Sequence, residues 1–176
     1  MVKGLEFPDN QTVSICKGGI QPHEVLQLLP SHQDILHHEQ YDSIRSVTLI
    51  VGTNALNVPP GRKKGRPVLD VVYDYEKLIH GLMDIFPNAR IGLYNVIPRS
   101  YNTIETRRRI ALFNDIFSDH VVTIYRNLFW IRQYWEFVDD FGFLRQDLYG
   151  KDGVHLKRKG KLLMSKAIVN FQRSYH

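Results

Sequence analysis

The chain has 176 residues, 43% of them hydrophobic and 23% charged, which is the composition of a globular domain long enough to bury one core. Its net charge of +5 makes it moderately basic. No apolar run approaches the roughly 18–20 residues that span a bilayer, and the N-terminus lacks a signal-peptide pattern. A single cysteine, Cys16, excludes internal disulfides and an all-cysteine metal site. We expect one domain over residues 1–176, without membrane contact, in an intracellular setting that is cytoplasmic rather than secreted.

Strands and a helical region are predicted in the first third of the chain. Residues 12–16, TVSIC, are β-branched and followed by Lys-Gly-Gly, which predicts a buried strand ending in a turn. Residues 21–30 predict a helix between two prolines, and residues 31–41 a second helical or irregular piece. Residues 46–52, SVTLIVG, form the clearest strand. Their near-continuous apolar character predicts burial on both faces, as in a parallel sheet covered by helices.

Strands and helices alternate through the rest of the chain. Residues 57–67 form the one obvious loop, with three prolines, two glycines and four cations. Apolar residues at helical spacing predict a helix over 68–86, and residues 90–98 predict the next strand. A helix over about 110–124 and a strand within 127–135 follow.

A closing helix is predicted over residues 158–172, with five apolar side chains directed inward: Leu162, Leu163, Ala167, Ile168 and Phe171. The alternation of strands and helices predicts a three-layer α/β/α sandwich with a mostly parallel sheet. In such sheets the chemistry gathers at the carboxyl ends of the strands. The segments Lys-Gly-Gly, Gly-Thr-Asn and Ile-Pro-Arg-Ser all fall at those ends, so we expect the functional site there.

The second chemical feature is the pair Asp152 and His155 in the segment KDGVHLKRKGK. An aspartate three residues before a histidine can reach the imidazole across a turn, fix its tautomer and stabilise its protonated form. This is the orienting and base half of a nucleophilic triad. An aspartate three residues before a histidine is also typical of a helix-start cap. The hypothesis of a catalytic pair therefore depends on the Gly-Thr-Asn segment that accompanies it.

Together the segments VGTNAL and DGVHL resemble two blocks of the SGNH (GDSL-type) hydrolase family. The resemblance runs from about residue 12 to the C-terminus and implies a flavodoxin-like α/β/α sandwich and ester hydrolysis by Ser-His-Asp chemistry. It implies that Asp152 orients His155, the general base. It also implies that Gly52 and the side chain of Asn54 help to form the oxyanion hole.

A glycine of the segment ICKGGI, either Gly18 or Gly19, would match a further block of the family, in which a glycine N–H completes the oxyanion hole. An oxyanion that develops during ester cleavage needs such fixed donors. In form the chain resembles the esterase-type domains of some retroelement proteins. It also resembles the C-terminal domain of Oskar, which lacks the catalytic residues and is regarded as RNA-binding.

Two departures from the family pattern affect the expected chemistry. Ala55 stands where the family has an aspartate, and the Gly-Asp-Ser block that carries the nucleophile is missing. If the first strand is missing too, either residues 12–16 pair directly with residues 46–52 or the chain is a fragment of a longer one. In a rival register, residues 12–16 are the first strand and Lys-Gly-Gly replaces Gly-Asp-Ser. Neither register puts Ser14 or Ser100 at the nucleophile position.

We therefore expect an SGNH-type esterase domain that is inactive or incomplete as given, with small carboxylic esters as substrates and neither a cofactor nor a metal. The alternative is a non-catalytic module that binds RNA or another nucleic acid. The phosphates of the nucleic acid would contact three clusters of cations, and the second and third clusters lie near predicted helix N-termini. The first cluster is Arg62, Lys63, Lys64 and Arg66; the second is Arg107, Arg108 and Arg109; the third is Lys157, Arg158, Lys159 and Lys161.

Four aromatic residues could stack on bases of single-stranded RNA, although aromatics at this spacing also build cores: Tyr73, Tyr101, Trp130 and Trp135. The histidines at positions 32, 37 and 38 give only a weak indication of a metal site, because helical spacing brings few of them to one face. The oligomeric state is left open.

Overall fold

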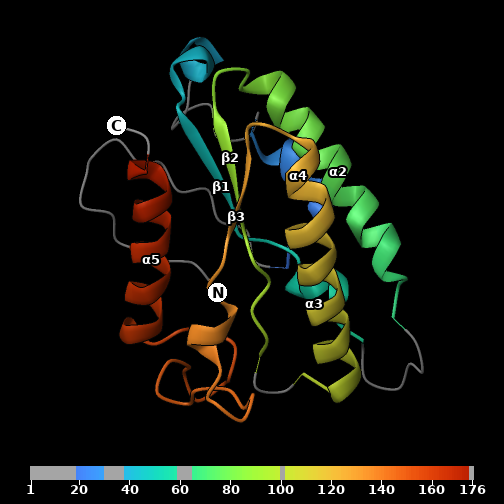
Figure 1. Ribbon diagram of the computed structural model, residues 1–176, viewed down its shortest axis with the longest axis vertical. Coiled ribbons are helices and arrows are strands. Elements are labelled where there is room, and N and C mark those ends of the chain that lie inside the picture. Colours follow the sequence, from blue (N-terminus) through green and yellow to red (C-terminus); the bar gives the residue numbers. More distant parts are fainter. Residues whose placement is uncertain (1–18, 30–37, 59–64, 100–101, 175–176) are drawn as a thin grey trace.

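The computed structural model describes residues 19–29, 38–58, 65–99 and 102–174. Within these ranges, a parallel sheet lies between two helical layers (Figure 1). Three helices cover one face and a single helix covers the other, which is the predicted three-layer α/β/α sandwich. The first layer holds α2 (Val68–Ile85), α3 (Ile104–Ile116) and α4 (Val122–Ile124), and the second holds α5 (Arg158–Arg173).

The sheet has the order β1 (Ser46–Leu49), β2 (Arg90–Tyr94), β3 (Leu128–Ile131), and all neighbours are parallel. Leu93 in β2 lies opposite Leu49 in β1 and Trp130 in β3. Because the strands are parallel, their carboxyl ends meet at one edge, where the loops that follow them gather.

Strand β1 is less buried than its apolar sequence predicts. Leu49 is buried, but the other three residues of the strand are half-buried. Among the described residues, β1 pairs only with β2, so one edge of the strand has no partner there. The strand predicted over residues 12–16, and with it the question of how the sheet closes, lies outside the described residues.

Helix α2 confirms the prediction made from its apolar spacing. Its buried side chains recur at three- and four-residue intervals, and Phe86 follows as the C-cap. Helix α3 begins earlier than predicted, because the side chain of Thr103 accepts a hydrogen bond from the N–H of Thr106 at 3.1 Å and caps the first turn. It continues through the π-helical turn η4 (Phe117–Val121) into α4.

The described residues before β1 form two 3₁₀ helices, η1 (Pro22–Leu28) and η3 (His38–Ser43). Both are wound more tightly than an α-helix. At the start of η1, the N–H of Gln21 donates to Oε2 of Glu24 at 2.7 Å. No helix within the described ranges is long and apolar enough to cross a membrane.

Helix α5 buries a different stripe from the predicted one. Met164, Ile168 and Phe171 are buried against the sheet, whereas Leu162, predicted to face inward, is 55% exposed. Two residues of helix correspond to about 200° of rotation, so Leu162 lies on the side opposite Met164. Leu163 and Ala167 pack at the margin of the same apolar cluster.

Candidate active site

Asp152 and His155 meet on a turn that leads into α5. Oδ2 of Asp152 lies 2.5 Å from Nδ1 of His155, and Oδ1 accepts hydrogen bonds from the N–H groups of Val154 and His155, each at 3.0 Å. The carboxylate therefore engages both the backbone and the imidazole. The side chain of His155 is 68% exposed, so the ring is open to a small molecule.

These hydrogen bonds hold the pKa of Asp152 far below its usual range, and the bond to His155 has the largest effect. A carboxylate that stays ionised is a permanent acceptor, and it favours the tautomer with the proton on Nδ1 of His155. Nε2 is then the basic nitrogen of the ring. The sequence pair thus has the geometry of an orienting acid and a base.

Backbone hydrogen bonds and close packing against α5 hold the turn that carries Asp152 and His155. The N–H of Gly150 donates to the carbonyl of His155 at 2.7 Å, and the N–H of Lys157 donates to that of Leu148 at 2.8 Å. Gly160 in α5 lies against Leu148, where an added Cβ would come within 2.7 Å of its carbonyl oxygen. The start of α5 can approach the turn this closely because residue 160 has no side chain.

The end of β1 carries the second predicted element. Gly52 has φ +113°, a conformation that side chains disfavour, and it begins the short helix α1 (Thr53–Leu56). Below it, the buried hydroxyl of Tyr75 donates to the carbonyl of Val51 at 2.5 Å. Burial raises the pKa of Tyr75, so this hydroxyl stays a neutral donor.

Asn54 lies in α1, and an arginine from the loop that follows β2 holds its side chain. Nη2 of Arg99, which follows β2, donates to Oδ1 of Asn54 at 2.8 Å. The carbonyl of Leu56, at the end of α1, accepts from Nε of Arg109 at 3.0 Å. Arg99 therefore holds the side chain of the predicted oxyanion donor, and Arg109 holds the end of the helix that carries it.

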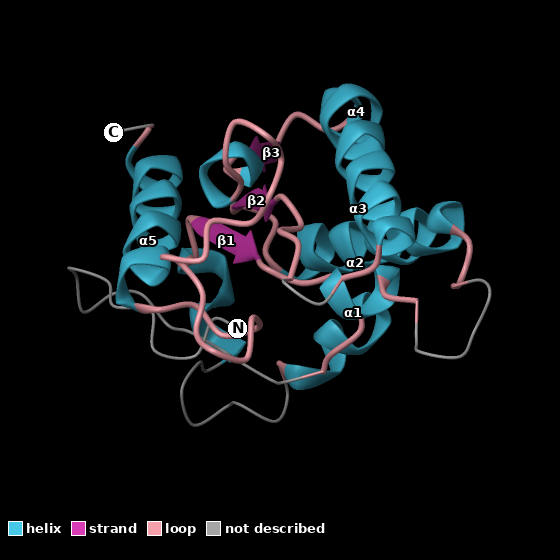
Figure 2. Ribbon diagram, turned by 90° about the horizontal axis from the view of Figure 1, so that it is seen from below, coloured by secondary structure: helices cyan, strands magenta, loops and turns pink. Residues whose placement is uncertain are grey.

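Hydrogen bonds link the two halves of the site. The hydroxyl of Tyr149, beside the Asp152–His155 turn, donates to the carbonyl of Pro98 at 2.9 Å, and Arg99 follows directly. The two predicted segments therefore adjoin one loop, the one that follows β2. In Figure 2, which views the molecule from this end, loops lie between α1 and α5.

Of the two glycines predicted as an oxyanion donor, the structure describes one. Gly18 lies outside the described residues. Gly19 is exposed in the turn before η1, with φ +77° and open space around its Cα. Gly19 thus lies in a turn whose left-handed backbone conformation favours glycine.

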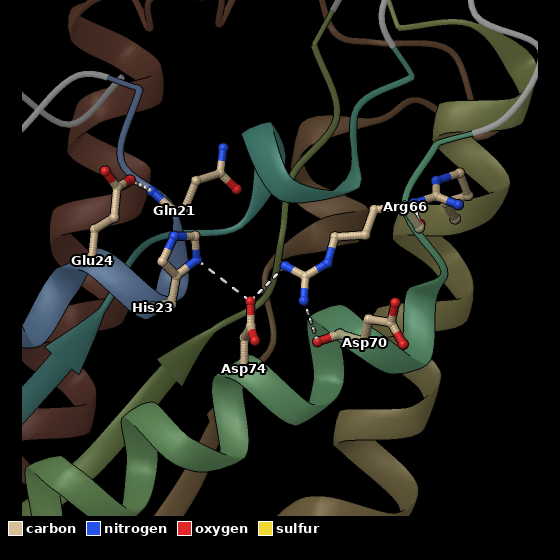
Figure 3. Close-up of polar contacts among 7 residues, drawn as sticks. Gln21, His23, Glu24, Arg66, Asp70 and Asp74 are labelled. Carbon is tan, nitrogen blue, oxygen red and sulfur yellow. Dashed lines mark hydrogen bonds and ion pairs between the residues drawn. The ribbon is translucent and has the colours of Figure 1, made fainter.

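Two of the predicted phosphate-binding arginines are engaged within the fold. Arg66 donates to Oδ2 of Asp74 at 2.5 Å, and His23 lies 3.5 Å from the same oxygen (Figure 3). This bond holds the pKa of Asp74 below its usual range. Arg109 is 9% exposed and donates to the carbonyls of Leu56 and Arg66, so its charge serves backbone groups rather than the surface.

Some of the other predicted phosphate-binding cations are bonded to neighbouring residues, and some are exposed on the surface. Lys159 pairs with Asp147, and Lys157 donates to the carbonyl of Gln146 at 3.1 Å. Arg108 and Arg158 are exposed. Arg107 and Lys161 are half-buried, and Arg62, Lys63 and Lys64 lie outside the described residues.

The aromatic candidates divide in the same way. Trp130 is half-buried; it stacks on Phe117, with ring centroids 6.0 Å apart, and packs against the core. Tyr73 and Trp135 are exposed, and Tyr101 is outside the described residues. In the described part of the chain, no three His, Cys, Asp or Glu residues are gathered so that they could hold a metal ion; His32 and His37 lie outside it.

Sequence reasoning missed the structural role of four residues at this site, one of which, Arg109, is a predicted phosphate-binding residue: Arg99, Arg109, Tyr75 and Tyr149. The segment Ile-Pro-Arg-Ser falls at a predicted strand end, which is the available signal for Arg99. The other three stand in helical or loop patterns that also describe ordinary surface or core residues.

No protein-family model and no curated protein matches the chain. Its structure is similar to several solved structures, each covered by the chain over 68% of its length. One, from Streptococcus pneumonia, is provisionally described as a platelet activating factor (TM-score 0.69, 19% identity, 87% of this chain). Another is a carbohydrate esterase of family 3 from Talaromyces cellulolyticus (0.63, 17%, 89%). A third is an acetyl esterase carrying a serine-to-alanine substitution, with an acetate ion (0.61, 15%, 89%). The chain therefore has the fold of SGNH-type esterases.

Proposed function

We propose that this chain is an SGNH-type ester hydrolase domain that carries the base and oxyanion parts of the site but no nucleophilic serine of its own. The observation that carries the proposal is the contact of 2.5 Å between Asp152 and His155, on a turn beside the loop that positions Asn54. The esterase fold of the neighbouring structures supports the same chemistry.

In this proposal His155 is the general base. Its Nε2 takes the proton of the attacking hydroxyl while Nδ1–H remains bonded to Asp152, which stabilises the imidazolium that forms. The side-chain N–H of Asn54 and the N–H of Gly19 or Gly18 donate to the oxyanion, and the same His155 then protonates the leaving alkoxide. Gly52 sets the turn that presents Asn54.

The attacking hydroxyl is assigned to water. The printed sequence contains no Gly-Asp-Ser, and we therefore expect slow hydrolysis without an acyl-enzyme. The genomic sequence upstream of Met1 tests why Gly-Asp-Ser is absent. A Gly-Asp-Ser encoded there in frame would supply the nucleophile of a complete esterase.

The test is hydrolysis of 4-nitrophenyl acetate by the wild type and by His155→Ala. General-base catalysis contributes about 10²–10⁴-fold, so the variant should lose at least about 10²-fold of the enzymatic rate. His80→Ala is the matched control, because His80 is another exposed histidine, bonded to Tyr125 on the helical face. Equal rates in wild type and His155→Ala would refute the esterase proposal. A serine labelled by a fluorophosphonate would refute the absence of a nucleophile.

The second candidate is a non-catalytic RNA-binding domain of the same fold. Its specific support is the exposure of Arg108 on α3 and of Lys157 and Arg158 at the start of α5. Exposed cations of this kind can neutralise phosphates, whereas the internally bonded Arg66 and Arg109 add little.

A further inference from the structure

Arg99 reaches from the loop after β2 back to α1, where it bonds the side chain of Asn54 at 2.8 Å. We propose that Arg99 is the positioning residue of the oxyanion hole: it turns the carboxamide of Asn54 so that Nδ2 points toward the developing oxyanion. This inference rests on the proposed ester hydrolase function and adds a residue to its site.

The first argument is the direction of the hydrogen bond. A guanidinium group only donates, so the atom of Asn54 that meets Arg99 must be the carbonyl oxygen Oδ1. With Oδ1 held there, Nδ2 lies at the opposite end of the planar carboxamide and carries both N–H groups. Without Arg99, the two ends of the carboxamide could exchange places, and in half of those arrangements an oxygen would face the oxyanion.

The second argument is the strength of the bond. Hydrogen bonds from a charged donor are about twice as strong as neutral ones, and they polarise the group that accepts them. The guanidinium of Arg99, bonded to Oδ1, therefore makes the side-chain N–H groups of Asn54 better donors. Ala55, next in α1, has no polar side-chain atom with which to orient its neighbour.

The third argument is that Arg99 is itself fixed. Its N–H donates to Oδ1 of buried Asn102 at 2.6 Å, and the N–H of Asn102 donates back to the carbonyl of Arg99 at 3.0 Å. On the other side, the carbonyl of Pro98 is held by Tyr149. The backbone at Arg99 is thus held from both sides, as a positioning residue requires.

The experiment is a titration of the ¹⁵N-labelled chain with acetate, which presents a carboxylate oxygen to the same donors. The side-chain amide signals of Asn54 report its orientation, and the backbone amide signals of α1 report acetate binding in every variant. We expect acetate to shift these signals in the wild type and Asn54→Ala to abolish binding. Since one oxyanion donor contributes about 10²–10³-fold, Arg99→Met, which leaves the donor present but unoriented, should raise the acetate Kd about 10-fold. The control Arg66→Met removes an arginine bonded elsewhere and should leave the Kd unchanged.

Two further variants separate positioning from mere stabilisation. Arg99→Lys keeps one charged donor and should restore most of the affinity. Asn54→Asp keeps a partner for Arg99 and should retain the melting temperature, yet it should lose acetate binding because the donor is gone. These variants also cover the case in which Arg99→Met fails to fold.

The outcomes distinguish the two proposals. If Asn54→Ala abolishes acetate binding but Arg99→Met and Arg99→Lys both bind like the wild type, the positioning role is wrong and the ester hydrolase proposal stands. If acetate leaves the Asn54 signals unmoved in the wild type, the oxyanion site itself is wrong, and both proposals fall with it.

Discussion

The hydroxyl of Tyr75 occupies the place where a side chain at position 52 would begin. It donates to the carbonyl of Val51 at 2.5 Å, and the Cβ of any residue replacing Gly52 would collide with it. Gly52 also has φ +113°. The turn that presents Asn54 therefore depends on a glycine for two separate reasons, conformation and space.

Gly52→Ala should lower the free energy of unfolding by about 3 kcal/mol, because backbone strain and overpacking add. The matched control is Gly142→Ala, where φ is +78° but nothing lies within 4 Å of an added Cβ. Only strain acts there, and about 1 kcal/mol is expected. Urea denaturation of both variants measures the difference, and equal losses would contradict the collision with Tyr75.

A double-mutant cycle tests the collision directly. Tyr75→Phe removes the hydroxyl and its bond to Val51, at a cost of about 1 kcal/mol. In the Tyr75→Phe background, Gly52→Ala should cost about 1 kcal/mol less than in the wild type, since part of the clash is gone. Strict additivity of the two substitutions would show that the hydroxyl does not limit position 52.

The Asp152–His155 turn should survive acid better than an ordinary aspartate turn. The folded-state pKa of Asp152 is lowered from 3.8, so the bonds of the carboxylate persist as the pH falls through 3.8 and break only below it. In an NMR titration, the carboxyl ¹³C signal of Asp152 should show no protonation step until the pH is below that value. A midpoint at the ordinary aspartate pKa would contradict the strength of the bond, and Asp152→Asn should show no such transition.

Asp74 should contribute acid-sensitive stability through Arg66 (Figure 3). Its folded-state pKa also lies below 3.8, so the contribution is present above pH 3.8 and is lost as the pH falls through the lowered value. Asp74→Asn should lose about 1.5–3 kcal/mol at pH 7, and less below pH 3.8. The control Asp70→Asn changes an exposed neighbour, for which less than about 0.5 kcal/mol is expected. A loss independent of pH would contradict the ionic part of the interaction.

The basic surface gives a prediction that separates the two candidate functions. If the domain binds RNA, replacing Arg108, Lys157 and Arg158 with Gln should weaken binding and reduce its salt dependence, by about 0.7 in logarithmic slope for each phosphate that is no longer neutralised. Filter binding at several salt concentrations measures this. Binding that is unaffected by salt and by these changes would remove the RNA-binding candidate.

Arg109→Gln should act on stability rather than on RNA. Its guanidinium is buried and donates to the carbonyls of Leu56 and Arg66, and charged hydrogen bonds of this kind contribute about 1.5–3 kcal/mol. Thermal denaturation should show a clear loss for Arg109→Gln and almost none for Arg108→Gln. The reverse order would place the surface role on Arg109.

Local patterns account for much of the fold. The spacing of apolar residues predicts α2 and the position of α5, because one face of a helix must be buried whatever lies opposite. The spacing fails at Leu162, since seven apolar residues within the ten positions 162–171 permit more than one buried stripe. The pairing of Asp152 with His155 is also local: three residues across a turn suffice to bring the two side chains together.

The way in which the site is held depends on packing between distant elements. Arg99 and Asn54 are 45 residues apart, and Tyr75 is 24 residues from the carbonyl that it binds. Sequence spacing does not encode such contacts. The same packing separates Arg109 from Arg108: a run of three arginines has one pattern in the sequence, but helix geometry turns one inward and its neighbour to the solvent. The residue types at the carboxyl edge of the sheet follow from the sequence alone, whereas the fold determines which of them touch.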